Sequence, residues 1–339
     1  TVHEVAFGAD LTSAQYNDLL ANSNGHQFIS SACPAIVGYV ERYHPELVGN
    51  LAPIVSPMIA LARYLRESST TPIKVVFVGP CIAKKMEADD PQVAGEIDAV
   101  LTFRELRHLM AQSPHDLSRA VPDSFDPPHG GSGALYPVSR GALQAAGVQE
   151  DLITGEILAT EGHSHVREAM QELANGNLKA KLLEVLCCEG CIMGAGMTSD
   201  LPMFARRQRV SESVGRRLQS VPQEAWQQEV RQAATVPLKR NFTAQDQRFA
   251  TPKEDELAEI LAQLGKVTAT DELNCGACGY ETCREHAIAI FRGLAEDEMC
   301  LPHTIDRLSE AYQELEESHQ ELATAQEALM HSEKLASMG

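Results

Sequence analysis

Nine cysteines are the residues of this sequence best suited to chemistry, and they could form disulfides, bind metal or pack as core thiols. They fall into two groups, one spread over the first two thirds of the chain and one near its end: Cys33, Cys81, Cys187, Cys188 and Cys191, then Cys275, Cys278, Cys283 and Cys300. An odd number of cysteines at short spacings, in a chain that opens without an export signal, favours metal sites over disulfides. We therefore expect thiolate-bound metal and a cytoplasmic location.

The group near the end has the spacing C-x2-C-x4-C-x16-C within LNCGACGYETCREHA and EDEMCLP. A cubane needs four converging thiolates, and Gly276 and Gly279 let the backbone of the first loop approach it closely. The fourth thiolate would return from the far end of a helix expected over 284–295. Zinc or unbound core thiols are the alternatives, but zinc more often takes paired CxxC hooks. The spacing therefore predicts a 4Fe-4S cluster on Cys275, Cys278, Cys283 and Cys300.

The elements that must position the first group read as alternating strands and helices. KVVFV at 74–78 and DAVLT at 98–102 predict strands, FRELRHLM predicts a helix, and LLEVL leads directly into CCEGC. A further helix is expected over 164–174, and 112–133 reads as a long surface loop. This alternation predicts an α/β fold with parallel sheets flanked by helices. Cys81 then follows a strand end, where open α/β sheets place their ligand sites.

The last third of the chain changes character. The apolar pattern lapses over 237–252, which indicates a linker, and TPKE at 251–254 is a capping box that opens a helix ending at Gly265. From 304 to 338 Gly and Pro are absent, and leucines recur every seven residues at Leu308, Leu315, Leu322 and Leu329. This predicts a coiled-coil helix that forms a homodimer, with a single exposed helix as the alternative. We divide the chain into 1–236, 237–264, 265–303 and 304–339.

Several passages of the first region resemble the catalytic domain of iron-only hydrogenases, over roughly 1–220. They are FGADLT, SACPAIV, VGPCIAKKMEA, IDAVLTFREL and LCCEGCIMGAG. The resemblance implies two α/β lobes that hold a 4Fe-4S cluster on four cysteines, Cys33, Cys81, Cys187 and Cys191. It further implies that Cys191 bridges to a di-iron subsite and that Lys84 holds a cyanide of that subsite. Cys188 is then expected to be a packed thiol. Over 265–303 the chain also resembles the small four-cysteine 4Fe-4S domain of bacterial redox proteins.

Four positions depart from the hydrogenase pattern. Ala32 stands where hydrogenases have the cysteine that passes protons, and Gly79 stands where they have a methionine. Ile36 replaces a tryptophan, and Met58 replaces the polar residue that follows Ser-Pro. Ala32 cannot carry a proton, so we expect little hydrogen turnover. The sequence is compatible both with a bound di-iron subsite and with its absence. The final HSEKLASMG resembles the start of a histidine-kinase dimerisation helix. The chain is therefore interpreted as a sensor of redox state, hydrogen or a small gas. A divergent redox enzyme or an electron-transfer subunit, with a ferredoxin or redox enzyme as partner, is the alternative.

The remaining features restrict the partners of the chain. A net charge of −19 argues against nucleic acid and anionic membrane surfaces, and no apolar run is long enough for a bilayer span. His129, His163 and His165 could be ligands, but capping or exposed histidines are the expected reading. The glycine-rich 130–133 lacks the lysine of a phosphate loop, and the resemblance places it near the metal site.

Overall fold

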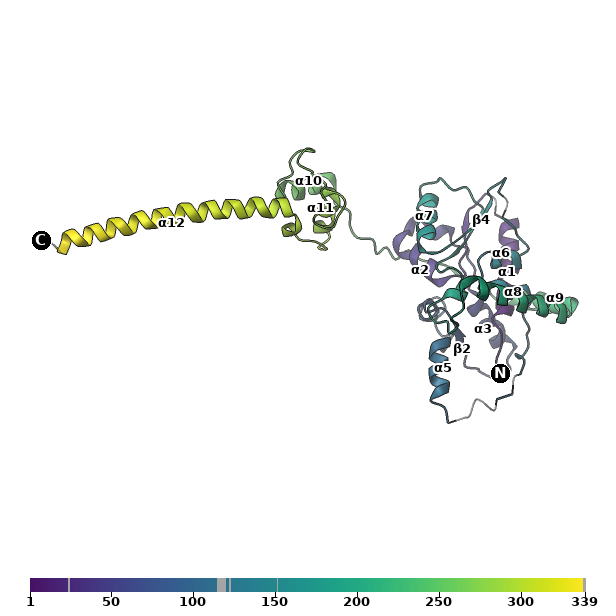
Figure 1. Cartoon of the computed structure of the whole chain (residues 1–339). Helices are drawn as coiled ribbons and strands as arrows, with labels where there is room; N and C mark the ends of the chain where they lie inside the picture. The colour runs from purple at the N-terminus through teal and green to yellow at the C-terminus, as the bar shows by residue number, and fades with distance from the viewer. Residues whose placement is uncertain (24, 115–119, 122, 151, 338–339) are drawn as a thin grey trace. The chain divides into compact units, whose positions relative to one another are not determined.

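A computed structural model describes residues 1–339 except 24, 115–119, 122, 151 and 338–339 (Figure 1). The side chains of 332 and 335–337 are also outside the description. The chain divides into two units, Thr1–Gln247 and Arg248–Gly339. None of the described helices is long and apolar enough to cross a membrane.

The first unit contains two parallel sheets. One has the order β1 (Phe28–Ile29), β5 (Leu182–Leu186), β4 (Ile157–Glu161), and the other pairs β2 (Val76–Gly79) with β3 (Ala99–Thr102). Every residue of β5 is buried, as its continuous apolar run predicts for a central parallel strand. The expected buried strand over 74–78 begins two residues later, and its first residue, Val76, is 52% exposed. β2 is therefore an edge strand of a small sheet, with β3 on one side only.

Helices surround both sheets in the first unit (Figure 1). They are α1 (Ala6–Ala21), α2 (Pro34–Tyr43), α3 (Pro57–Ser68), α4 (Ala83–Ala88), α5 (Phe103–Ala111), α6 (Gly141–Ala145), α7 (His163–Ala174), α8 (Met203–Ser220) and α9 (Gln223–Gln232), with short 3₁₀ turns η1 (Pro45–Asn50), η3 (Ser132–Leu135), η4 (Cys191–Met193) and η5 (Ala233–Thr235). The helices expected over 103–110 and 164–174 are confirmed as α5 and α7. The described part of 112–131 contains neither helix nor regular strand, so the loop prediction holds there.

Each sheet has its own hydrophobic core, which is why the unit has two lobes. Phe7, Ile59 and Leu238 belong to the core beside β2 and β3. Ile36 and Val185 belong to the core around β1 and β5. The prediction of parallel sheets flanked by helices is confirmed, and the parallel strands form two separate sheets.

The segment 237–247 corrects the predicted linker. The amide of Val55 donates to the carbonyl of Leu238 at 2.9 Å, and the amide of Gln247 donates to the carbonyl of Arg42 at 2.9 Å. Leu238 and Arg240 are buried. This segment therefore packs on the first unit. The segment is extended, and backbone amides and isolated side chains attach it to the unit. It therefore has no hydrophobic periodicity that the sequence could show.

The second unit contains α10 (Glu254–Gln263), α11 (Cys283–Phe291), the 3₁₀ turn η6 (Asp297–Met299) and α12 (Leu301–Ser337). Leu257 and Leu261 of α10 pack against Ala287 of α11, so α10 is part of the four-cysteine unit and not of a linker. The expected cap at 251–254 is also wrong, because the N-cap is Lys253, whose amide donates to Glu256 at 2.7 Å. Gly265 ends α10 at φ +72°, as predicted.

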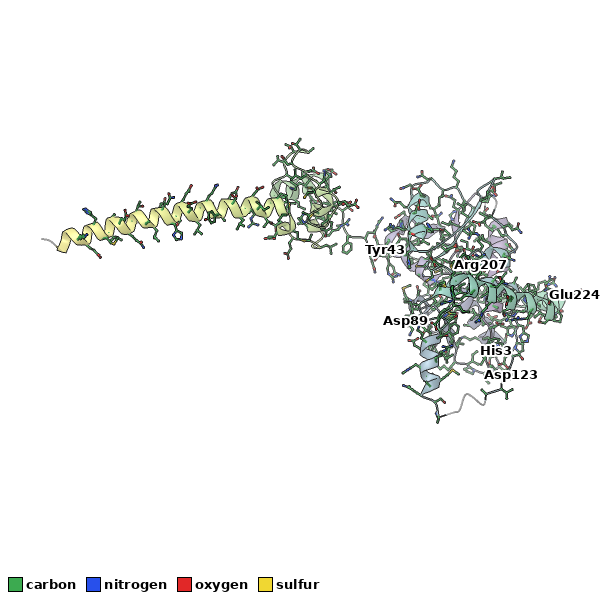
Figure 2. All side chains as sticks on the ribbon, in the orientation of Figure 1. His3, Tyr43, Asp89, Asp123, Arg207 and Glu224 are labelled. Atoms are coloured by element: carbon green, nitrogen blue, oxygen red, sulfur yellow. The ribbon has the colours of Figure 1, made fainter. Side chains whose placement is uncertain are left out.

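The long C-terminal helix is confirmed as α12, which begins three residues before the expected start. Pro302 lies in its first turn, where a missing amide costs nothing, so this proline suits the start of the helix. Figure 2 shows side chains projecting from α12 on all sides along its length. The four heptad leucines are all more than half exposed, Leu308, Leu315, Leu322 and Leu329. The homodimer stays a prediction.

Candidate metal centres

The distributed cysteines lie on three loops of the first unit that follow strands or precede a helix. Cys33 is the N-cap of α2, Cys81 comes two residues after β2, and Cys191 opens η4 after β5. Cys81 and Cys191 therefore both follow the carboxyl ends of parallel strands, as expected for a ligand site in an open α/β sheet.

The thiols of this group lie close enough to one another to affect each other's ionisation. Burial raises the pKa of Cys191 to about 12, and negative charge on Cys33 and Cys81 raises it further. Burial likewise raises the pKa of Cys187 to about 11, with Cys33 as the next cause. The amide of Cys187 also donates to the Cys33 sulfur. The structure thus brings Cys33, Cys81, Cys187 and Cys191 together in one site.

A cavity of about 1410 Å³ opens at this site and is lined by Cys33, Cys81, Cys191 and Lys84. Within the described residues, no three His, Cys, Asp or Glu side chains are grouped as a single metal ion would require. A polynuclear cluster instead spreads its thiolates over several iron corners. Bound iron would replace the thiol protons, which burial otherwise retains. The soft donor set and the roomy cavity fit an iron–sulfur cluster.

Two glycines after Cys191, Gly194 and Gly196, close this site. A Cβ on Gly194 would lie 2.7 Å from the Pro80 carbonyl oxygen, and one on Gly196 would lie 2.7 Å from the Thr102 side chain. The amide of Gly196 donates to Pro80 at 2.8 Å. These glycines therefore admit the backbone of the Cys81 loop and do not make room for the inorganic group itself. They hold the Cys81 and Cys191 loops together.

Cys188 lies beside the expected ligands, which the sequence interpretation did not anticipate. Negative charge on Cys188 raises the pKa of Cys191, and the pKa of Cys188 is raised by burial and then by Cys33 and Cys81. Cys187 has the same neighbours, because its pKa is raised by burial and then by Cys33, Cys188 and Cys81. β5 ends at Leu186, so both cysteines lie in the bend that follows the strand. Cys188 is therefore a second candidate beside Cys187 for the ligand next to Cys191.

Lys84 is held at the cavity by a buried ion network. Its Nζ donates to Glu87 at 2.7 Å, and the second oxygen of Glu87 accepts from Arg240 at 3.0 Å. Arg240 also donates to Asp90 at 3.0 Å. All but Asp90 are more than nine-tenths buried, so each charge depends on its partner. The positive charge of Lys84 lowers the pKa of Cys191, which places the two side by side.

Three of the four departures from the hydrogenase pattern lie in the cavity wall, at Ala32, Met58 and Gly79. A Cβ on Gly79 would lie 2.6 Å from the Phe77 ring, so this ring blocks the place of a larger side chain. Ile36 instead is buried in the core around β5. The changes at the site thus give an apolar wall that offers no proton carrier at position 32.

The glycine-rich turn at 130–133 is closed by a carboxylate that the sequence interpretation missed. Asp10 accepts from the amides of Gly131 and Gly133 at 2.6 Å each and from the Trp226 indole at 3.0 Å. Burial raises the pKa of Asp10 to about 6. Since these amides already have a partner, they do not form a phosphate cradle. Gly133 lines the cavity, as the resemblance implies. The candidate ligands His129, His163 and His165 are all exposed.

The compact site in the second unit brings its four cysteines to one pocket, lined by Cys275, Cys278, Cys283 and Cys300. Its first loop turns through Gly276 at φ +70° and Gly279 at φ +85°, which other residues adopt only with strain. Asn274 accepts from the Cys283 amide at 2.8 Å and so fastens this loop to the start of α11.

The walls of this pocket carry further groups. The imidazole of buried His286 lies 3.1 Å from the Glu296 carbonyl oxygen and stacks on Tyr280. Buried Lys266 also lines the pocket. Four thiols that converge on one pocket fit an iron–sulfur cluster, and the glycine turns allow it to be wrapped closely.

Comparisons with known proteins agree with these two sites. The family model "Iron only hydrogenase large subunit, C-terminal domain" matches residues 1–195, and a second model, for an Fe-S cluster domain, matches 271–302. The chain is 27% identical to "Iron hydrogenase 1" of Clostridium pasteurianum over 244 residues, which is 58% of this chain and 42% of that protein. It is 30% identical to "Cytosolic Fe-S cluster assembly factor NAR1" of Vanderwaltozyma polyspora over 92 residues, 27% of this chain and 18% of the other.

The fold has counterparts among solved structures. The apo [FeFe]-hydrogenase HydA1 from Chlamydomonas reinhardtii matches with a TM-score of 0.57 at 17% identity, covering 72% of this chain and 84% of that chain. This likeness confirms the hydrogenase-like fold. The chain spans less than half the length of either curated relative.

Proposed function

The chain belongs to the family of the iron-only hydrogenase large subunit, C-terminal domain, and we propose that it is an iron–sulfur sensor that signals through α12 to a histidine kinase. One 4Fe-4S cluster would be held by Cys275, Cys278, Cys283 and Cys300, and another by Cys33, Cys81, Cys191 and one of the adjacent pair Cys187 and Cys188. A bound cluster takes up or releases single electrons. The cysteines supply its anchoring, and the surrounding residues sense its charge.

The observation that carries the proposal is the buried ion network at Lys84. It connects the cavity wall, through Glu87, to Arg240. Arg240 belongs to the segment 237–247, which leads directly into the second unit. A change of charge beside Lys84 alters the balance of a buried network, because each ion there is stabilised mainly by its partners. The segment 237–247 is therefore a two-state element that the cavity can bias.

The second part of the proposal is an output through α12. Its heptad leucines have no partner within the described chain, and a second copy of the helix would cover them. The resemblance of HSEKLASMG to the start of a kinase dimerisation helix supports this direction of signalling. A homodimer through α12 is thus part of the proposed mechanism.

A divergent hydrogenase-like enzyme or electron-transfer subunit, with a ferredoxin or redox enzyme as partner, is the second candidate. The placement of Lys84 beside Cys191 supports it, since the resemblance gives that lysine a contact with a di-iron subsite. Ala32 weighs against hydrogen turnover because no proton carrier replaces the missing cysteine at that point of the wall.

Hydrogen exchange on the full chain with reconstituted clusters distinguishes the two candidates. We expect reduction to change the exchange rate of amides in 237–247, and Arg240→Gln to remove that difference. Lys181→Gln, which breaks an exposed pair with Glu156 in the same unit, is the control and should retain it. Equal exchange in the oxidised and reduced wild type, or hydrogen evolution at hydrogenase rates, would refute the sensor.

A further inference from the structure

Glu184 is a buried acid on the wall of the cysteine cavity that the sequence motifs do not explain. It lies in the middle of β5, is 3% exposed and lines the same cavity as Cys191. One of its oxygens accepts from the Ala142 amide at 3.1 Å. The other oxygen is buried without a hydrogen-bond partner. A fully buried carboxylate oxygen with no donor is costly when ionised, so this group gains by binding a proton.

The groups around Glu184 explain its tendency to take a proton. Burial raises the pKa of Glu184 to about 7, while the Ala142 amide and then the charge and the amide of Arg140 oppose the increase. Glu150, beyond the end of α6, raises it further. Tyr16 of α1 and Tyr136 after η3 lie near it; burial raises the pKa of each, and the charge of Glu184 adds to the increase. Both tyrosines therefore remain neutral near pH 7 and do not compete for the proton.

The opposite side of Glu184 leads toward solvent. Arg140 is 46% exposed and pairs with Glu150 at 2.5 Å and with Glu161 of β4 at 3.5 Å. This exposed ion cluster stands between Glu184 and the surface of the unit. Glu184 is thus a titratable group between the metal cavity on one side and a charged, solvent-accessible cluster on the other. Lys84, on the same cavity, is already bound to Glu87.

We propose that Glu184 is the proton-binding group of the cavity, which binds one proton when one electron enters the iron–sulfur cluster and releases it on oxidation. The electron comes from a low-potential one-electron donor, and the proton comes from solvent on the Arg140 side. An O–H bond forms on the carboxylate, and no other bond changes. The proton on Glu184 thereby neutralises the negative charge that the electron adds to the cavity. Ala32 cannot do this, because its side chain binds no proton. This inference rests on the proposed cluster in the cavity.

The test is a potentiometric titration of the full chain with reconstituted clusters, reduced stepwise with dithionite and followed by EPR. The signal of the cavity cluster is the one that Cys81→Ser removes. Its midpoint potential should fall with rising pH above about pH 7, approaching about 59 mV per pH unit, which is the tenfold change in proton activity for a one-electron couple. In Glu184→Gln the potential should not depend on pH.

Glu156→Gln is the matched control, because Glu156 lies beside the same sheet in an exposed pair with Lys181. It should keep the pH dependence of the wild type. A second readout needs no cluster: the infrared carbonyl stretch of a protonated carboxylic acid should titrate near pH 7 in the wild type and be lost in Glu184→Gln. If that variant does not fold, Glu184→Asp is the alternative: its carbonyl stretch should still titrate, but at a different pH.

Two results would overturn the inference: a pH-independent potential for the cavity cluster of the wild type, or the same pH dependence in Glu184→Gln. The absence of any EPR signal that Cys81→Ser removes would instead refute the proposed cluster in the cavity.

Discussion

The two cysteine sites differ in what holds their ligands in place. In the first unit, three separate loops meet because two hydrophobic cores and the glycines after Cys191 fix their positions. In the second unit, one short segment wraps a pocket, and its only core cluster among the described residues is Leu257, Leu261 and Ala287. The fold of the first unit therefore positions its ligands, whereas the fold of the second unit depends on the group that its cysteines bind. A domain with so small a core usually requires a metal or another cross-link.

The largest expected effect comes from breaking the second site. Cys283→Ser should unfold the second unit, since structural metals in small domains contribute on the order of 10 kcal/mol to folding. Cys81→Ser should remove the cavity cluster but leave the first unit folded. Limited proteolysis with mass spectrometry of the fragments measures the first effect, and fluorescence of Trp226, the only tryptophan, reports on the first unit. A second unit that resists protease without iron would contradict the claim that its fold depends on the metal site.

A smaller change separates the two adjacent cysteines of the first site. Cys187→Ser should lose the cavity cluster, because the resemblance makes Cys187 a ligand together with Cys33, Cys81 and Cys191. Cys188→Ser is the matched control and should retain the cluster, although Cys188 also lies near Cys33 and Cys81. Iron content and the EPR spectrum of the reduced protein measure both. The reverse result would make Cys188 the ligand.

The second unit alone continues into α12, so self-association should depend on that helix. Leu315→Glu should weaken the dimer at least a hundredfold, because it places a charge in a seam where even Leu-to-Ala changes cost about 2–5 kcal/mol. Glu317→Gln, two residues further on the same helix and outside the leucine position, should leave association unchanged. Sedimentation equilibrium of the full chain measures both. A wild-type chain that is monomeric at all concentrations would refute the seam.

The pH dependence of stability should have opposite signs in the two units. The pKa of Asp10 is raised by burial to about 6 in the folded state, so the folded chain binds more protons than the unfolded chain between about pH 4 and 6. Stability of the first unit is therefore lost as pH rises through that range, by up to about 3 kcal/mol. In the second unit, hydrogen bonds from Thr268 lower the pKa of Asp271, so its contribution is lost as pH falls below about 4.

Urea unfolding of the full chain at several pH values checks this prediction. Trp226 fluorescence follows the first unit, and the far-ultraviolet signal that remains reports on the helical second unit. Asp10→Asn should reduce the dependence of the first unit between pH 4 and 6, and Glu184, whose pKa burial raises to about 7, should supply what remains. Stability of the first unit that rises steadily with pH would contradict the account.

Local patterns in the sequence predicted the elements that depend on local physics. The β-branched run before Cys81, the amphipathic helices α5 and α7, and the glycine-free α12 all have the expected type and nearly the expected bounds. What the patterns could not provide were long-range partners. Arg240 lies in a stretch without periodicity, and its place in the Lys84 network depends on a fold that brings distant segments together.

The same limit applies to the buried acids. Asp10 lies in α1, a helix that no sequence pattern predicted, and Glu184 lies in the apolar run LLEVL; nothing local indicates that either residue is buried. A charged residue within a continuous apolar strand is a signal that could have been used for Glu184, because such residues are rarely buried without a role. The adjacent Cys187 and Cys188 show a related limit, since both lie near Cys33 and Cys81 and spacing alone does not separate their roles.

The central claim is that each unit holds its own 4Fe-4S cluster, and iron and sulfide analysis combined with EPR of the reduced full chain tests it most directly. We predict about eight iron and eight sulfide per wild-type chain and about four of each in Cys81→Ser, since each cubane contains four. The EPR spectrum of that variant should retain one cluster signal. A wild-type chain that binds only four irons under the same reconstitution, or a Cys81→Ser variant that loses none, would contradict the account.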